Sequence, residues 1–173
     1  MANVVIVSDM VRGFCEEGHA LYCGKAARDI IPNIQRLLER ELAAGSVILY
    51  VNDMHAPDDS EFKLFPRHCV SGSDEVEIIP ELSGYPGEVI AKTRYSAFYN
   101  TSLSQKLSEL KPARLIICGV CTDICVLFTA ADAMYRGYDI EIPVDCVASF
   151  DEAAHRFALN HMRKLFGARL TSS

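Results

Sequence analysis

One segment of this 173-residue chain places three cysteines close to the start of a predicted helix. A short apolar run, 115–117, is typical of a buried strand, and it is followed by Cys118, Cys121 and Cys125. Residues 127–136, which come next, are predicted to be helical. A cysteine near a helix N-terminus lies close to free backbone N–H groups and to the positive end of the helix dipole, which favour a thiolate. Acyl transfer needs a nucleophile and donors for an oxyanion, so Cys125 is a candidate nucleophile.

The same cysteines allow other interpretations. A free cysteine is most often a small apolar core residue. Cys118 and Cys121 form a C-x-x-C pair, which suits a redox dithiol, but the sequence has no second C-x-x-C to complete a four-cysteine zinc site. The chain has seven cysteines, an odd number, and no secretory signal, so we expect reduced thiols and a cytoplasmic protein.

Three other apolar runs are each followed within two residues by a charged side chain: 4–8 by Asp9, 47–51 by Asp53 and 89–91 by Lys92. Ligands of doubly wound sheets bind at the carboxyl ends of the parallel strands, so we expect these groups to meet Cys125 there. Lys92 would then stabilise the thiolate and lower its pKa, while Asp9 would accept the thiol proton and pass it to a leaving group. The alternatives are a helix cap for Asp9 and a solvated surface charge for Lys92.

A set of candidate metal ligands begins at Asp53. His55 stands two positions further on, on the same side of an extended segment, and Glu61 and His68 follow. Two imidazoles and two carboxylates suit a divalent metal such as zinc, with positions left for water or substrate. The irregular stretch 53–88 is roughly 35 residues long, and stretches of that length are usually functional. The alternative is a set of solvent-exposed loop residues.

Apolar strands and amphipathic helices alternate along the chain. The predicted strands are 4–8, 47–51, 89–91, 115–118, 140–144 and 168–170, and the predicted helices are 26–44, 103–110, 127–136 and 151–166. Continuous apolar strands alternating with helices predict a three-layer, doubly wound α/β fold, with a mostly parallel sheet covered by helices on both faces. The length and the absence of a linker or repeat predict a single domain over residues 1–173.

These motifs resemble the isochorismatase-like cysteine hydrolases over nearly the whole chain. The matching segments are the opening 9–14, Lys92 with the stretch 96–98, the segment 119–126, the helix residues 130–133 and the segment 144–149. The resemblance implies the isochorismatase-like fold and an Asp9–Lys92–Cys125 catalytic triad. It also implies a cis peptide bond between Val120 and Cys121, and an oxyanion hole formed by the N–H groups of Cys121 and Cys125. Cys118 would then be a core residue.

The set Asp53, His55, Glu61 and His68, with His68 inside the segment 65–72, resembles the metal site of the nicotinamidase branch. That resemblance implies a divalent metal, zinc as first choice with iron or manganese as alternatives, which binds the pyridine nitrogen of nicotinamide. Coordination would fix the carboxamide over Cys125 and withdraw electrons from it. The implied reaction is hydrolysis of nicotinamide to nicotinate and ammonia through a cysteine thioester. Phe65 stands where many nicotinamidases have tryptophan.

Aromatic side chains are candidates for contact with a flat ring. Phe14 and Phe65 would sandwich a pyridine, and Tyr95 would line the same pocket. The alternative for the two phenylalanines is ordinary core packing.

Other partners and functions follow from charge and from the resemblance. The net charge of −6 argues against nucleic acid and against an anionic membrane surface, and no apolar stretch approaches the ~20 residues that span a bilayer. Relatives commonly self-associate, so the resemblance implies a homo-oligomer that acts on a small molecule. The main alternative is another amidohydrolase of this family, acting on a carbamoyl or ureido amide. A redox dithiol or a catalytically silent binding module is the non-hydrolytic alternative.

Overall fold

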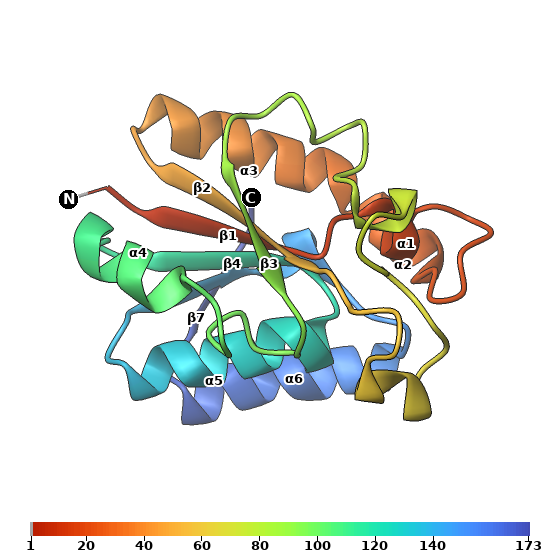
Figure 1. The fold of residues 1–173 in the computed structure, drawn as a ribbon. Helices are drawn as coiled ribbons and strands as arrows, with labels where there is room; N and C mark the ends of the chain where they lie inside the picture. The colour runs from red at the N-terminus through yellow and green to blue at the C-terminus, as the bar shows by residue number, and fades with distance from the viewer. Residues whose placement is uncertain (1) are drawn as a thin grey trace.

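The computed structural model describes residues 2–173. A parallel sheet lies at its centre (Figure 1). Seven strands follow the order β3-β2-β1-β4-β5-β7, with β6 paired to β4. The strands are β1 (Val4–Ser8), β2 (Val47–Asp53), β3 (Glu88–Lys92), β4 (Leu115–Val120), β5 (Ile140–Pro143), β6 (Val147–Ala148) and β7 (Arg169–Thr171). Their pairings are all parallel. The chain winds outward from β1 to β3 and then returns to β4, which confirms the doubly wound fold and puts the switch point between β1 and β4.

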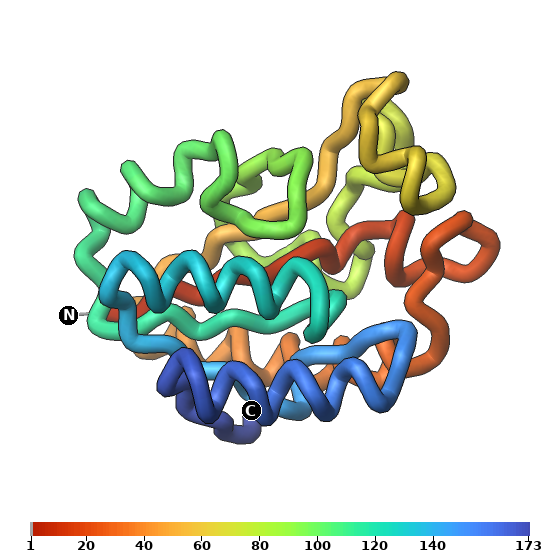
Figure 2. The backbone as a smooth tube through the Cα atoms, turned by 90° about the horizontal axis from the view of Figure 1, so that it is seen from below, coloured from red at the N-terminus to blue at the C-terminus, as the bar shows by residue number. Residues whose placement is uncertain are grey.

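Helices cover both faces of the sheet. The helices are α1 (Arg12–Cys15), α2 (Gly24–Asp29), α3 (Ile31–Ala43), α4 (Leu103–Leu110), α5 (Leu127–Tyr135) and α6 (Glu152–Leu165). Alternate side chains of β1 enter separate cores: Val5 and Val7 pack with α2 and α3, while Val4 and Ile6 pack with α4, α5 and α6. Figure 2, which views the molecule from below, shows α5 and α6 running side by side in front of the sheet. No helix within residues 2–173 is long and apolar enough to cross a bilayer.

One predicted helix differs from the observed ones. The predicted helix 26–44 is two helices, α2 and α3, which meet at Ile30. Pro32 has no N–H to donate to the carbonyl four residues earlier, so the hydrogen bonding is interrupted and restarts with Pro32 in the first turn of α3. The predicted helix 127–136 is α5, and it is preceded by a π-helical turn, Thr122–Val126, which contains Cys125.

The irregular segment between β2 and β3 begins beyond the carboxyl ends of the strands, at the right of Figure 1, and then runs back over the top of the view to the start of β3. It contains two short 3-10 turns, Ser60–Lys63 and Asp74–Val76. Two backbone hydrogen bonds fix the segment at His55. The N–H of His55 donates to the carbonyl of Cys69 over 2.8 Å, and the carbonyl of His55 accepts the N–H of Ser71 over 2.8 Å. The first part of the segment, which bears His55, Glu61 and His68, therefore presents these side chains to the carboxyl edge of the sheet.

Gly119 allows β1 and β4 to approach closely at that edge. Its φ is +106°, and a Cβ there would lie 2.1 Å from the carbonyl oxygen of Ser8. We expect Gly119→Ala to lower the free energy of unfolding by about 3 kcal/mol, because the substitution adds both a clash and a disfavoured backbone conformation. Urea denaturation followed by circular dichroism measures this loss.

Gly45 offers a matched control, since its φ is +82° but no atom lies within 4 Å of the added Cβ. Gly45→Ala should cost about 1 kcal/mol, from the backbone conformation alone. Equal losses in the two variants would contradict the role of the close approach to Ser8.

Candidate active site

The carboxyl edge of the sheet brings together Asp9, Lys92 and Cys125. Asp9 follows β1, Lys92 ends β3 and Cys125 lies in the turn after β4. The ammonium of Lys92 lies 3.3 Å from Sγ of Cys125 and 3.0 Å from Oδ2 of Asp9, and it also binds Oδ1 of Asp53. Its side chain is fully buried. The sequence-based expectation that these three groups meet at one edge is confirmed.

The backbone around Asp9 aims its carboxylate at this group. Asp9 has a φ of +55°, in the left-handed region, and its N–H donates to the carbonyl of Val51 over 3.1 Å. Oδ1 accepts the N–H of Asp53 over 2.7 Å, and Oδ2 accepts the hydroxyl of Ser8 over 3.0 Å. A carboxylate oxygen of Asp9 and Sγ of Cys125 lie within 4.8 Å of each other. The carboxylate is thus held close to the thiol by fixed hydrogen bonds.

Burial decides the protonation of these groups. It raises the pKa of the Cys125 thiol well above its usual value, and the opposing effect of Lys92 is smaller. Lys92 therefore lowers the pKa as expected, but the expected net lowering is wrong. Burial and the charge of Asp53 raise the pKa of Asp9. Burial lowers the pKa of Lys92, but Asp53 and Asp9 outweigh it and keep the ammonium charged. The thiol therefore rests protonated, and the carboxylate beside it, Asp9, is made more basic by its surroundings.

The segment before Cys125 also has the expected backbone. The peptide bond between Val120 and Cys121 is cis, as the resemblance implies. Sγ of Cys121 lies 3.6 Å from Sγ of Cys23. Cys118 is fully buried in the core on the α3 side of the sheet. Both cysteines of the C-x-x-C pair are free thiols, and Cys121 contacts the thiol of Cys23, which does not favour a dithiol between Cys118 and Cys121.

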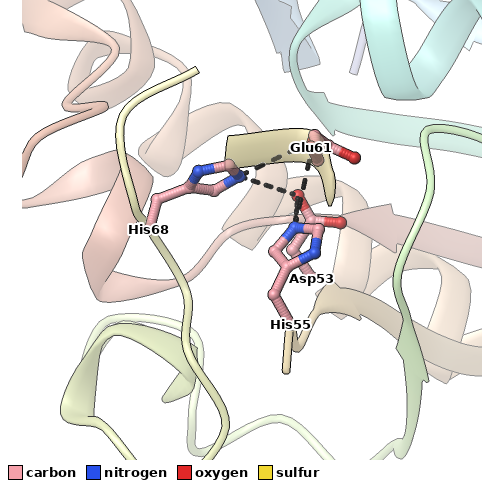
Figure 3. Close-up of side chains that lie close together, drawn as sticks. All are labelled: Asp53, His55, Glu61 and His68. Carbon is pink, nitrogen blue, oxygen red and sulfur yellow. Dashed lines mark ion pairs between the residues drawn. The ribbon is translucent and has the colours of Figure 1, made fainter. Parts of the chain in front are cut away.

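The four predicted metal ligands converge beside this group (Figure 3). One donor atom from each of Asp53, His55, Glu61 and His68 lies within 4.8 Å of the others, and all four residues are buried. Nε2 of His55 is 3.6 Å and Nε2 of His68 is 3.9 Å from Oδ2 of Asp53. Oε1 of Glu61 lies 3.9 Å from Nε2 of His55 and 3.8 Å from Nε2 of His68. The expectation that these are exposed loop residues is excluded.

The donor set fits a divalent cation. Nε2 of His55 is buried and has no hydrogen-bond partner among the described residues. The Nδ1 atoms of both rings are engaged: Nδ1 of His55 lies 3.0 Å from Asp59, and Nδ1 of His68 lies 2.7 Å from the carbonyl of Pro66. Burial lowers the pKa of His55, but its contacts with Asp53 and Asp59 outweigh it and raise the pKa to about 9. Two imidazole nitrogens and two carboxylates facing one point are a donor set typical of zinc.

A pocket of about 360 Å³, part of it open to solvent, connects the thiol to the candidate metal ligands. Its lining includes Asp9, Cys125, Asp53, Glu61 and His68 and the three predicted aromatic residues Phe14, Phe65 and Tyr95. The rings of Phe14 and Phe65 lie 5.7 Å and 6.4 Å from that of His68, centroid to centroid. A flat heterocycle in this pocket would touch aromatic faces and reach the ligand cluster.

Some residues that line the pocket were not predicted from the sequence. Leu21, Ile124 and Phe150 also line the pocket, and Phe150 is 46% exposed at its mouth. They lie in loops or in the π turn, where no hydrophobic period marks them. Asp59, which contacts His55, was also missed. Asp59 lies four residues after His55, but this spacing predicts a contact between them only when the conformation of the loop is known.

A doubly wound sheet with a thiol, a carboxylate and an ammonium group gathered at its carboxyl edge has the arrangement of a cysteine hydrolase with a three-layer α/β fold. The chain belongs to the isochorismatase family, because the isochorismatase domain matches residues 3–173. It is therefore an isochorismatase-family hydrolase.

Three solved structures show how widely this fold is shared. The nicotinamidase/pyrazinamidase PncA from Bacillus subtilis is 35% identical, with a TM-score of 0.91 over 99% of this chain and 100% of that one. The N-carbamoylsarcosine amidase from Thermoplasma acidophilum is 32% identical, with a TM-score of 0.89 over 99% and 96%. The pyrazinamidase of Pyrococcus horikoshii in complex with zinc is 28% identical, with a TM-score of 0.91 over 100% of both chains. The names of these relatives cover more than one amide substrate.

Proposed function

We propose that this protein is a metal-dependent nicotinamidase, which hydrolyses nicotinamide to nicotinate and ammonia. The observation that carries the proposal is the position of Asp53, which joins the two halves of the pocket. One of its carboxylate oxygens binds Lys92, beside Cys125, and the other faces the imidazoles of His55 and His68. A substrate with a ring nitrogen at one end and an amide at the other matches that arrangement. Similarity to a nicotinamidase/pyrazinamidase and to a zinc-bound pyrazinamidase supports it.

In the proposed reaction Cys125 is the nucleophile. Its Sγ attacks the carboxamide carbon while Asp9 takes the thiol proton, over an approach of at most 4.8 Å in the absence of substrate. The N–H groups of Cys121 and Cys125 stabilise the oxyanion. Lys92, 3.3 Å from Sγ, stabilises the developing thiolate. The C–N bond then breaks, and Asp9 returns the proton to the departing nitrogen. Ammonia is released, and the acyl group remains bound to Cys125 as a thioester.

Hydrolysis of the thioester uses the same residues in reverse. Asp9 takes a proton from a water molecule, which attacks the thioester carbon. The C–S bond breaks, Cys125 regains its proton from Asp9, and nicotinate leaves. A divalent ion held by Asp53, His55, Glu61 and His68 would supply a Lewis acid that binds the pyridine nitrogen and withdraws electrons from the amide. Phe14, Phe65 and Tyr95 would hold the ring.

A second candidate is an amidohydrolase acting on a small carbamoyl or ureido amide. The N-carbamoylsarcosine amidase at 32% identity favours it, and the triad would serve such a substrate equally well. Ammonia release from a panel of nicotinamide, pyrazinamide, N-carbamoyl and ureido compounds separates the two. Nicotinamide must be the better substrate by kcat/KM, and release from carbamoyl compounds alone would overturn the proposal.

Removal of metal is expected to abolish turnover of nicotinamide and to leave the fold intact. The four ligands lie at the end of β2 and on the irregular segment that follows it, outside both hydrophobic cores. After dialysis against a chelator, ammonia release should fall to background, while the circular dichroism spectrum is unchanged. Added zinc, iron or manganese should restore activity, and their ranking would identify the working metal. Unfolding on chelation would instead show that the metal is structural.

A further inference from the structure

Asp59 is a buried carboxylate at the centre of the hydrogen bonds behind the candidate metal ligands. Its side chain is 7% exposed and caps the 3-10 turn Ser60–Lys63. One oxygen, Oδ2, lies 3.0 Å from Nδ1 of His55, and the other, Oδ1, accepts the N–H of Glu61 over 2.9 Å. A single carboxylate therefore contacts two of the four candidate ligands, one through its ring and one through its backbone.

The contact with His55 determines which ring nitrogen faces the cluster. When Nδ1–H donates to the Asp59 carboxylate, Nε2 carries a lone pair in the plane of the ring and points away from Asp59. That atom is the buried Nε2 that has no hydrogen-bond partner among the described residues and faces Asp53 and Glu61. A carboxylate partner also raises the basicity of an imidazole ligand. His68 differs, because its Nδ1 faces only the neutral carbonyl of Pro66.

Arg94 holds Asp59 in place. Its Nη1 lies 3.0 Å and 3.1 Å from the two carboxylate oxygens, and its Nη2 donates to Oγ of Ser60 over 3.2 Å. Arg94 follows Lys92 by two positions, so this contact ties the ligand-bearing loop to the strand end that carries the ammonium beside Cys125. The path runs along the backbone from Lys92 to Arg94, and from there through the contact of Arg94 with Asp59 and that of Asp59 with His55.

We propose that Asp59 is a positioning residue for the metal site, which orients His55 and Glu61, and that Arg94 fixes Asp59 in that role. Neither residue lies among the four ligands themselves. The inference rests on the proposed metal-dependent function, and it adds that the affinity for metal depends on residues that do not touch the ion.

The test measures zinc affinity directly, by competition with a chromophoric chelator, in Asp59→Asn. Asparagine keeps the size of the side chain but removes its charge, and its NH₂ group can donate to Nδ1 and favour the tautomer in which Nε2 carries the proton. Loss of such an outer partner typically weakens metal affinity about 10- to 100-fold, and we expect a dissociation constant raised by that factor. Saturating zinc should restore turnover, since the triad is unchanged.

Asp58→Asn is the matched control, because Asp58 is the exposed neighbouring carboxylate. Its zinc affinity should stay within about twofold of wild type. Arg94→Gln keeps the Asp59 carboxylate and should weaken zinc binding less than Asp59→Asn. This variant decides the question if Asp59→Asn does not fold.

The outcomes separate this inference from the proposed function. A wild-type protein that binds none of zinc, iron and manganese overturns both. A wild-type protein that binds zinc, with equal affinity in folded Asp59→Asn and Asp58→Asn, overturns only the positioning role. Lost turnover in Asp59→Asn that excess zinc does not restore also contradicts it, because the defect would then lie in the triad.

Discussion

Replacing Cys125 with alanine should abolish ammonia release from nicotinamide. We expect a loss of at least about 10⁴-fold in kcat, the scale seen when a covalent nucleophile is removed. The physical reason is that Sγ of Cys125 is the thiol that faces Lys92 at 3.3 Å and shares a 4.8 Å cluster with Asp9 and Asp53. Alanine removes the only atom that forms the thioester in the proposed reaction. A coupled ammonia assay with purified, zinc-supplemented protein measures the effect.

Two other cysteine variants provide the controls. Cys118→Ala should retain most of the activity, because its side chain is fully buried in the core and does not line the pocket. Cys121→Ala should also remain active, because only the backbone N–H of Cys121 takes part in the proposed reaction. Activity that survived in Cys125→Ala would contradict the hydrolase mechanism. Activity that disappeared in Cys118→Ala, in a folded protein, would favour the dithiol alternative.

Much of this site was predictable from the sequence because residues that follow parallel strands lie at the same edge of the sheet. Each apolar run predicts a buried strand, and the carboxyl ends of parallel strands share one edge. The positions of Asp9 and Lys92 directly after such runs were therefore sufficient to predict that they meet. The metal set was different, since Glu61 and His68 lie on an irregular segment whose path no periodicity describes. Their residue types made them candidates and a resemblance to nicotinamidases singled them out, while the structure brings their donor atoms to within 4.8 Å of one another.

The features that the sequence did not predict depend on three-dimensional context. The break at Ile30 follows from Pro32, which interrupts an otherwise continuous amphipathic pattern. The role of Asp59 depends on the 3-10 turn that it caps. The pKa of Cys125 depends on how deeply the thiol is buried, and burial outweighs the nearby ammonium. A cysteine near a helix start therefore did not suffice to predict a resting thiolate.

Replacing Lys92 with methionine should cost both stability and activity. The Lys92 side chain is fully buried and its ammonium binds the carboxylates of Asp9 and Asp53. Methionine has a similar shape but leaves two buried carboxylates without this cation. Removing one partner of a buried ion pair typically destabilises a protein by about 3–5 kcal/mol, and we expect that loss in the free energy of unfolding at neutral pH. Urea denaturation with a chelator in every sample measures it without a contribution from bound metal.

Lys106→Met controls for the loss of a lysine as such. Lys106 pairs with Glu88 at 2.6 Å, and the Glu88 side chain is 54% exposed, so this surface ion pair should contribute no more than about 1 kcal/mol. A double variant, Lys92→Met with Asp53→Asn, tests the cause of the larger loss. If the penalty comes from uncompensated charge, neutralising Asp53 should recover part of the stability, so the double variant should be less destabilised than the sum of the single changes. If the stability losses of the two single variants simply add, Lys92 stabilises the fold through packing alone. The proposed electrostatic coupling between the triad and the ligand cluster would then be contradicted.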